Sequence, residues 1–267
     1  MNGFELFLKF DEDDEDSAEI LVQGEVQGRP YTFLLDTGTG ASALCLDDFT
    51  RGFARVGIHE SSGIIGNIQD DQITIPNLKL GSVECSSLTV TRLVEESGHR
   101  NNLIGMDILK DYCCTFRFDL NRVILGREGV AYPADLNELF LDAKYHPYVP
   151  VELMGTEAQA VWDTGASLSC VDMGFIREHR EAFVDAGESE GTDASGNTLE
   201  TPLFMMEGFS CDGHPFPPHK VVGIDLSYVN SKIDHPMTMI LGYSTLYKAN
   251  WLFDFPERKW GILNMLA

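Results

Sequence analysis

Two short motifs in the chain repeat the same three residues in similar surroundings. Asp36-Thr37-Gly38 follows the apolar run Phe33-Leu34-Leu35. Asp163-Thr164-Gly165 follows Ala160-Val161-Trp162, and in both cases a serine lies six residues after the aspartate. A single Asp-Thr-Gly string occurs easily by chance. Two copies with matching neighbours indicate that both have the same structural role.

The residue types in these motifs can perform acid and base chemistry. A strand that ends at an aspartate carries the carboxyl to the edge of the core, and the following glycine lets the backbone turn back. The threonine hydroxyl can hydrogen-bond a neighbouring loop. If the two loops face each other, their carboxyls cannot both ionise, because like charges at short range separate the two pKa values. A pair that shares one proton provides a base and an acid in one site.

A second repeated element follows each motif in the two halves of the chain. Leu103-Ile104-Gly105 precedes a predicted short helix and two strands within residues 106–126. Ile240-Leu241-Gly242 precedes the same succession within residues 243–263. Glycine at this position allows two backbone segments to pass close to each other. The repeated order predicts two similar lobes that arose by duplication.

These motifs resemble those of pepsin-like and retropepsin-like aspartic proteases, in particular the retropepsin-like aspartyl proteases of prokaryotes, here with two lobes in one chain. The resemblance implies a mainly β acid-protease fold. Its two β-barrel-like lobes, with a few short helices, would be related by a pseudo-twofold axis and enclose a cleft. We expect an N-terminal lobe over residues 1–130, a linker over 131–150 and a C-terminal lobe over 151–267.

The resemblance also implies the roles of the site residues. Asp36 and Asp163 would form the catalytic dyad and hold a water molecule that attacks the peptide bond of an extended peptide. No covalent intermediate, metal or cofactor is needed for this reaction. The residues that support the dyad would be Thr37, Gly38, Thr39, Thr164, Gly165 and Ala166.

Two turn-rich stretches are the predicted flaps, which would bind a peptide or protein substrate as an added strand. The substrate-binding residues of the first flap would be Gly63, Ile64, Ile65 and Gly66, and those of the second Ser195, Gly196 and Asn197. The first stretch contains no tyrosine, whereas pepsin-like enzymes have one at the flap tip. Its absence favours the retropepsin side of the resemblance.

The residue after each motif differs between the two halves. It is Thr39 in the first and Ala166 in the second, whereas pepsin-like enzymes usually have a hydroxyl residue in both lobes. Loss of a hydroxyl that donates to the ionised carboxyl raises the lower apparent pKa of the dyad. We therefore expect activity at weakly acid or neutral pH.

Two other functions are compatible with parts of this pattern. The motifs could be remnants in a catalytically silent peptide-binding or scaffold protein. Residues 36–39 are also similar to the phosphorylated Asp-Lys-Thr-Gly-Thr loop of cation pumps, but the sequence lacks the lysine, a membrane span and a nucleotide motif. The seven histidines show no serine or cysteine partner pattern and are expected to be structural or exposed.

Composition restricts the partners and the compartment. Nineteen basic and 42 acidic residues give a formal charge of −23, which argues against nucleic acid and anionic membranes as partners. No apolar run is long enough to span a bilayer, and the start of the chain does not resemble a secretory signal. The six cysteines have no zinc-like spacing and suit packed thiols in a reducing cytoplasm. We expect a cytoplasmic monomer.

Hydrophobic patterns predict several further elements. Residues 4–10 are predicted to form one strand, and residues 18–26 and 31–35 two more around a turn at 28–30. Residues 171–186, with apolar side chains on one face, are predicted to be a helix. The proline-rich segment 214–219 is predicted to be a surface turn or a wall of the cleft.

Overall fold

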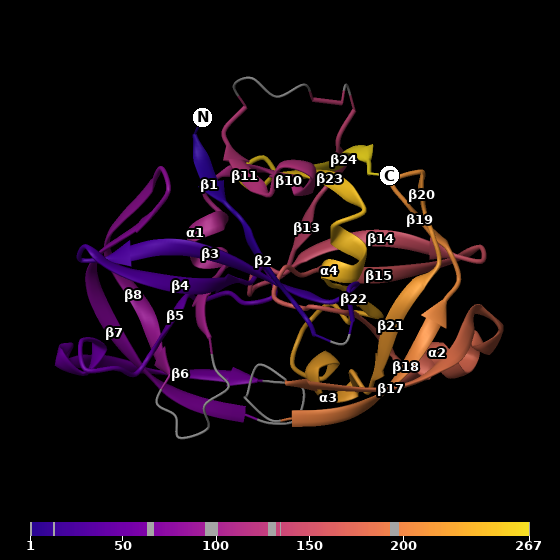
Figure 1. The fold of residues 1–267 in the computed structure, drawn as a ribbon, viewed down its shortest axis with the longest axis horizontal. Coiled ribbons are helices and arrows are strands. Elements are labelled where there is room, and N and C mark those ends of the chain that lie inside the picture. Colours follow the sequence, from indigo (N-terminus) through magenta and orange to yellow (C-terminus); the bar gives the residue numbers. More distant parts are fainter. Residues whose placement is uncertain are drawn as a thin grey trace.

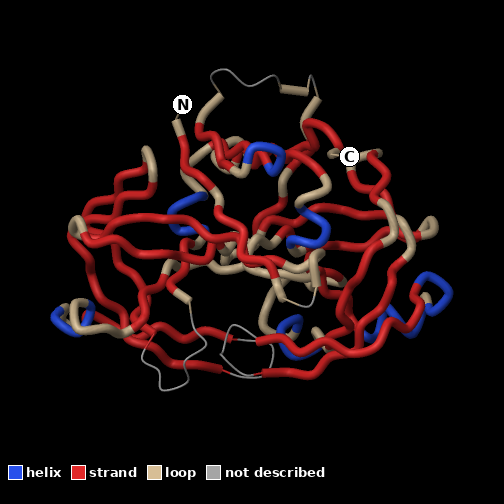
Figure 2. Tube along the Cα trace, viewed as in Figure 1, coloured by secondary structure: helices blue, strands red, loops and turns tan. Residues whose placement is uncertain are grey.

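Strands make up most of the computed structural model, and its helices are short (Figure 2). The structure describes residues 2–12, 14–62, 67–93, 101–127, 132–133, 135–192 and 198–266. Its α-helices are α1 (Met106–Leu109), α2 (Met173–Glu178), α3 (Ser227–Asn230) and α4 (Tyr243–Leu246). Single 3₁₀ turns are η1 (Thr50–Gly52), η2 (Phe118–Leu120) and η3 (Arg180–Ala182). No helix within these ranges has the length and apolar character needed to cross a bilayer.

The first-half sheet carries the Asp36 motif and has the strand order β2-β3-β4-β9-β5-β8-β7-β6. The predicted strand 18–26 is confirmed, and its turn lies at Gln27-Gly28, where both φ values are positive. The next strand therefore begins at Arg29, earlier than predicted. The strands are β2 (Phe7–Phe10), β3 (Ala18–Val26), β4 (Arg29–Leu35), β5 (Ala43–Cys45), β6 (Arg55–Ser62), β7 (Asn67–Leu80), β8 (Val83–Leu93) and β9 (Asn102–Ile104).

The second-half sheet carries the Asp163 motif and lies at the opposite side of the molecule (Figure 1). Its order is β17-β18-β21-β16-β22-β15-β14-β19-β20, and β13 pairs with β14. The strands are β13 (Phe140–Leu141), β14 (Pro147–Leu153), β15 (Thr156–Trp162), β16 (Ser169–Asp172), β17 (Phe183–Thr192), β18 (Thr198–Met206), β19 (Phe209–Cys211), β20 (His214–Phe216), β21 (His219–Ile224) and β22 (Met239–Leu241).

A third sheet, called the shared sheet below, combines strands from both halves in the order β1-β11-β10-β23-β24-β12. Its central contact is the antiparallel pairing of Cys113–Phe116 with Trp251–Asp254, and it lies at the top of the view in Figure 1. The strands are β1 (Gly3–Glu5), β10 (Cys113–Arg117), β11 (Arg122–Leu125), β12 (Asn137–Glu138), β23 (Ala249–Asp254) and β24 (Lys259–Met265). The division at 1–130, 131–150 and 151–267 stays a prediction, and backbone hydrogen bonds join the two halves.

Aromatic side chains connect the shared sheet to the second motif. The ring of Trp162, the residue before Asp163, is fully buried. Its centroid lies 4.5 Å from that of Phe116 in β10 and 4.7 Å from that of Phe253 in β23. Large buried rings of this kind contribute much of the burial energy of a core. The strand that ends at Asp163 is thus fixed by side chains of both halves.

The predicted strand over residues 4–10 is interrupted at Leu6. Residues 3–5 pair with β11 in the shared sheet, whereas residues 7–10 pair with β3 in the first-half sheet. Leu6 itself is buried where the chain passes from one sheet to the other. Alternating hydrophobicity marks extended chain but does not reveal a change of partner strand.

The predicted helix over residues 171–186 is wrong for most of its length. Helix α2 begins after Asp172, whose side chain accepts bonds from the backbone N–H groups of Gly174 and Phe175, and it ends at Glu178. From Phe183 onward the chain is strand β17, which pairs with β18. Strand pairing outweighs the helical pattern here, as tertiary context commonly does.

The predicted surface turn over residues 214–219 is also wrong. Residues 214–216 form strand β20, and β21 begins at His219. Phe216 and His219 are both buried, with exposed fractions of 2% and 3%. The two prolines between them remove backbone donors but leave the flanking residues extended, so the strands approach the core on either side.

Candidate active site

Each aspartate of the repeated motifs directly follows a strand and is held by the next parallel strand. The Asp36 backbone N–H donates to the carbonyl oxygen of Ile104 over 2.9 Å. The Asp163 N–H donates to the carbonyl of Leu241 over 3.0 Å. Strand β4 is parallel to β9, and β15 is parallel to β22. The two halves thus place their aspartates by the same local construction.

The threonines of the two motifs hold the loops together. The Thr37 N–H donates to Thr164 Oγ1, and the Thr164 N–H donates to Thr37 Oγ1, each over 3.1 Å. The Thr37 hydroxyl also donates to the carbonyl oxygen of Trp162 over 2.8 Å. Both threonines are almost fully buried. These reciprocal bonds join residues 127 positions apart in the sequence and bring the two motifs face to face.

The glycines of the motifs lie against the opposite carboxyls. A Cβ atom on Gly38 would lie 2.4 Å from Asp163 Oδ2, and one on Gly165 would lie 2.5 Å from Asp36 Cγ. The Gly38 N–H donates to Asp163 Oδ1 over 3.0 Å, and the Gly165 N–H donates to the same oxygen over 2.8 Å. Any larger residue would separate the loops, so close approach of the carboxyls requires glycine at both positions.

The two carboxyls have different electrostatic surroundings. Loss of hydration and the nearby charge of Asp163 raise the pKa of Asp36 well above its usual value, although N–H groups of Gly38 and Thr39 oppose this shift. Loss of hydration also raises the pKa of Asp163, but the N–H groups of Gly165 and Gly38 and the charge of His146 oppose it. Asp163 is therefore the more readily ionised partner, and Asp36 the one that keeps a proton. Both residues remain partly exposed to solvent.

Each loop is fixed to the short helix that follows the repeated glycine. In the first half, Ser42 Oγ donates to Asp107 Oδ1 over 2.6 Å and accepts from the Gly105 N–H over 3.0 Å. In the second half, Ser169 Oγ accepts from the Gly242 N–H, also over 3.0 Å. A Cβ on Gly242 would lie 2.6 Å from the Ala166 carbonyl oxygen. The predicted close backbone contact at these two glycines is confirmed.

The hydroxyl of Thr39 has a different partner from the one expected. It donates to the carbonyl oxygen of Ala41 over 3.5 Å, while the Thr39 backbone N–H interacts with Asp36. The difference between Thr39 and Ala166 is therefore not the source of the asymmetry between the carboxyls. That asymmetry comes from the charge of His146, which favours ionisation of Asp163, and from the charge of Asp163, which disfavours ionisation of Asp36.

His146 is a neighbour of the site that sequence reasoning missed. Its Nδ1 lies 2.7 Å from Asp142 Oδ2, and its side chain is 12% exposed. The turn that holds it packs against the first loop, because a Cβ on Gly40 would lie 2.8 Å from the Lys144 carbonyl oxygen. The Asp142 to His146 spacing is visible in the sequence, but only folding brings this turn to the dyad.

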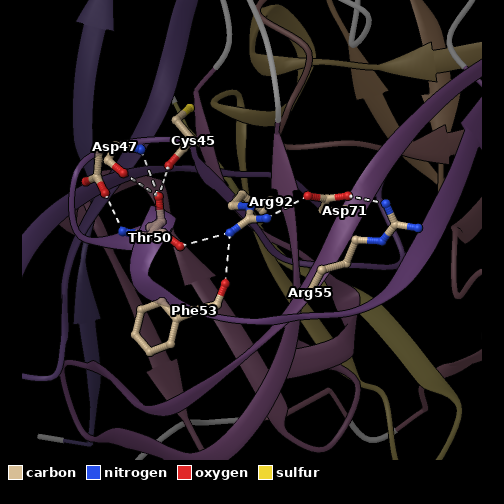
Figure 3. A network of polar contacts seen from close by, with 7 residues as sticks. All are labelled: Cys45, Asp47, Thr50, Phe53, Arg55, Asp71 and Arg92. Atoms are coloured by element: carbon tan, nitrogen blue, oxygen red, sulfur yellow. Dashed lines mark hydrogen bonds and ion pairs between the residues drawn. The ribbon is translucent and has the colours of Figure 1, made fainter.

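The predicted flap residues Gly63, Ile64, Ile65, Gly66, Ser195, Gly196 and Asn197 lie outside the described residues. The strands that flank them, β6 with β7 and β17 with β18, form antiparallel hairpins along the lower edge of Figure 1. Arg92 connects the base of the first hairpin to the η1 turn (Figure 3). It donates to the carbonyls of Thr50 and Phe53 and to Asp71 Oδ2.

Comparison with known protein families gives one match in the first half of the chain. Residues 22–111 match the model described as gag-polyprotein putative aspartyl protease. The match indicates a retropepsin-like aspartyl protease domain over these residues, and the mainly β architecture with few short helices is consistent with an aspartic protease fold of two lobes. The matched range includes Asp36 and ends before Asp163. No curated protein matches the chain.

Proposed function

We propose that the protein is an aspartic endopeptidase in which Asp36 and Asp163 act together on a peptide or protein substrate. The observation that carries this proposal is the reciprocal bonding of the two motifs, in which each threonine N–H meets the opposite hydroxyl and each glycine lies against the opposite carboxyl. Because one chain contributes both aspartates, a monomer suffices for activity.

The unequal surroundings of the carboxyls support distinct roles in the reaction. Asp163 takes a proton from a water molecule, whose oxygen forms a bond to the carbonyl carbon of the peptide, while Asp36 gives its proton to the carbonyl oxygen. Asp36 then takes that proton back as the C–N bond breaks. Asp163 transfers its own proton to the leaving nitrogen. The dyad returns to its initial protonation state without a covalent intermediate.

The two hairpins support binding of the substrate in extended form. Strands β6, β7, β17 and β18 flank the predicted flap residues in the sequence and lie along the lower edge of the view in Figure 1. An extended peptide gains backbone hydrogen bonds from such edges, and its alternate side chains point to opposite sides. Residues 63–66 and 195–197 are the proposed contacts.

The test is hydrolysis of an unstructured protein such as casein between about pH 3 and 7, where carboxyl pairs titrate, with and without pepstatin. We expect Asp36→Asn and Asp163→Asn each to reduce kcat/KM by about 10³-fold or more, because each removes one partner of the proton exchange. Asp48→Asn is the control, since the Asp48 side chain is fully exposed. A wild-type protein that retains peptides without cleaving them would instead be a catalytically silent binding or scaffold protein.

A further inference from the structure

A series of buried hydroxyl groups behind the second catalytic loop ends at the imidazole of His219. His219 begins strand β21, Thr245 lies in helix α4, and Ser169 begins strand β16. Their exposed fractions are 3%, 0% and 1%. Buried polar groups are costly unless they are hydrogen-bonded, so the partners of these three side chains determine whether the arrangement is stable.

The hydrogen-bond directions follow from the outer partner of the imidazole. His219 Nδ1 lies 2.9 Å from the Pro217 carbonyl oxygen, which can only accept, so Nδ1 carries the proton. In the neutral ring Nε2 is then an acceptor. The Thr245 hydroxyl, 2.7 Å away, donates to it. Thr245 Oγ1 in turn accepts from the Ser169 hydroxyl over 2.8 Å.

Ser169 connects these hydrogen-bonded hydroxyl groups to the loop that carries Asp163. Its oxygen accepts from the Gly242 N–H over 3.0 Å and from the Ser244 hydroxyl over 3.1 Å. Its own N–H donates to Ser244 Oγ over 2.9 Å. The Tyr243 N–H donates to the carbonyl of Ala166, three residues after the aspartate. Helix α4 and the loop are therefore held together by backbone N–H bonds of fixed direction and by hydroxyl bonds of Ser169 whose directions depend on His219.

The first catalytic loop is held by a different chemical group. Ser42 corresponds to Ser169, and there both its N–H and its hydroxyl donate to the carboxyl of Asp107, two residues after Gly105. Two residues after Gly242 the second half has Ser244, a neutral side chain that can both donate and accept. The second loop thus depends on a neutral acceptor, the His219 imidazole, which the hydroxyls of Ser169 and Thr245 reach in sequence.

The charges around His219 are few and come from neighbouring elements. Burial is the main cause that lowers the pKa of His219 to about 4, and the charge of Lys248 acts in the same direction, while the bond to Pro217 and the charge of Asp16 oppose it. Tyr247, the residue before Lys248, donates to Asp16 Oδ1. The imidazole is therefore neutral at weakly acid and neutral pH.

We propose that His219 is a positioning residue for the second catalytic loop, which keeps Asp163 in place by accepting the Thr245 hydroxyl proton and so fixing the direction of the bond from Ser169. A proton on Nε2 would face the proton of Thr245 and leave a buried hydroxyl without its acceptor. The second loop therefore loses this support at low pH, and activity falls further on the acid side of the pH profile. The inference rests on the proposed function, since it assigns a role in that same site.

Paired variants separate this role from simple packing. Thr245→Val keeps the shape but removes the hydroxyl, and Thr245→Ser retains it. We expect the valine variant to lose about 10-fold in kcat with little change in KM, because the loop is displaced rather than the substrate contacts, and the serine variant to stay near wild type. His219→Gln retains an acceptor that does not titrate. It should keep activity at pH 6 and extend it to lower pH, whereas His219→Phe should resemble Thr245→Val.

A measurement without substrate keeps this inference separate from the proposed function. Nitrogen chemical shifts of the imidazoles, with His219 assigned through His219→Gln, should show a proton on Nδ1 and titration near pH 4. A proton on Nε2, or titration near about pH 6.5 as in an exposed histidine, would overturn the proposal even if the protein cleaves casein. Thr245→Val with the kcat and pH profile of the wild type would overturn it as well. If the valine variant does not fold, the imidazole measurement on the wild type decides.

Discussion

The two aspartates differ in their neighbours although their motifs repeat the same residues. Asp163 Oδ1 accepts two backbone N–H bonds and lies in the field of His146, whereas the charge of Asp163 itself disfavours ionisation of Asp36. Both pKa values lie above the usual value of an aspartate. The active form with a single shared proton should therefore exist at weakly acid pH, and a profile that peaks near pH 2 would contradict this account.

Ala166→Thr tests how hydrogen bonds to Asp163 determine the fall of activity on the acid side of the pH profile. If the new hydroxyl donates to ionised Asp163, and not to a backbone carbonyl as Thr39 does, it stabilises the charged form and lowers its pKa, so activity should persist to lower pH. One charge-assisted hydrogen bond corresponds to a shift of about one pH unit. The measurement is kcat/KM against pH. Thr39→Val is the matched control and should shift this fall of activity little, because that hydroxyl bonds Ala41. A larger shift from Thr39→Val than from Ala166→Thr would contradict the assignment.

At the scale of elements, the first hairpin is attached to its lobe through Arg92. This side chain is 9% exposed and reaches the η1 turn on one side and Asp71 in β7 on the other (Figure 3). Arg55 approaches the same carboxyl from the exposed side, with N and O atoms 3.5 Å apart. Two arginines thus share one carboxyl, and Arg92 differs in being buried and in also bonding the carbonyls of Thr50 and Phe53.

Arg92→Met should reduce the free energy of unfolding by about 2–3 kcal/mol, because it removes charged hydrogen bonds from two backbone carbonyls, one of them buried, and from a carboxylate. Arg55→Met should cost less than about 1 kcal/mol, as is usual for an exposed ion pair. Denaturant unfolding of the two variants measures the difference. Equal losses of unfolding free energy would show that Arg92 stabilises the fold through its ion pair with Asp71 and not through its bonds to Thr50 and Phe53. We also expect Arg92→Met to raise KM, because the hairpin base becomes less fixed.

At the scale of the whole molecule, the shared sheet makes the two halves interdependent. Strand β10 of the first half pairs with β23 of the second, and Phe116 packs on Trp162 beside the dyad. Arg127 bonds to Asp254 across the same boundary. Neither half completes this sheet alone, so the fold should unfold in one cooperative step.

Phe116→Ala should reduce the free energy of unfolding by about 3–5 kcal/mol, the usual cost of removing a fully buried phenylalanine ring. Phe7→Ala is the control and should cost about 1 kcal/mol or less, because Phe7 is 42% exposed. Hydrogen exchange should show peptides from β3 and β15 losing protection together in Phe116→Ala. Loss of protection in one half only would mean that the halves unfold separately.

The sequence by itself determined the local chemistry of this protein. The apolar runs before Asp36 and Asp163 predict strands because their side chains must be buried, and the repeated glycines at 105 and 242 mark close backbone contacts. The strand over 18–26 was predictable for the same reason. These features depend on residues near one another in the chain, where periodicity and glycine content are informative.

Which distant groups meet depends on the folded arrangement of the chain. The strand over residues 4–10 divides between two sheets, and residues 183–186 pair as a strand instead of extending a helix. Nothing in the sequence around His146 and His219 marks them as neighbours of the site, yet His146 lies close enough to affect the charge of Asp163 and His219 lies behind the Asp163 loop. Pairing partners and electrostatic neighbours are set by long-range packing, which local patterns do not encode.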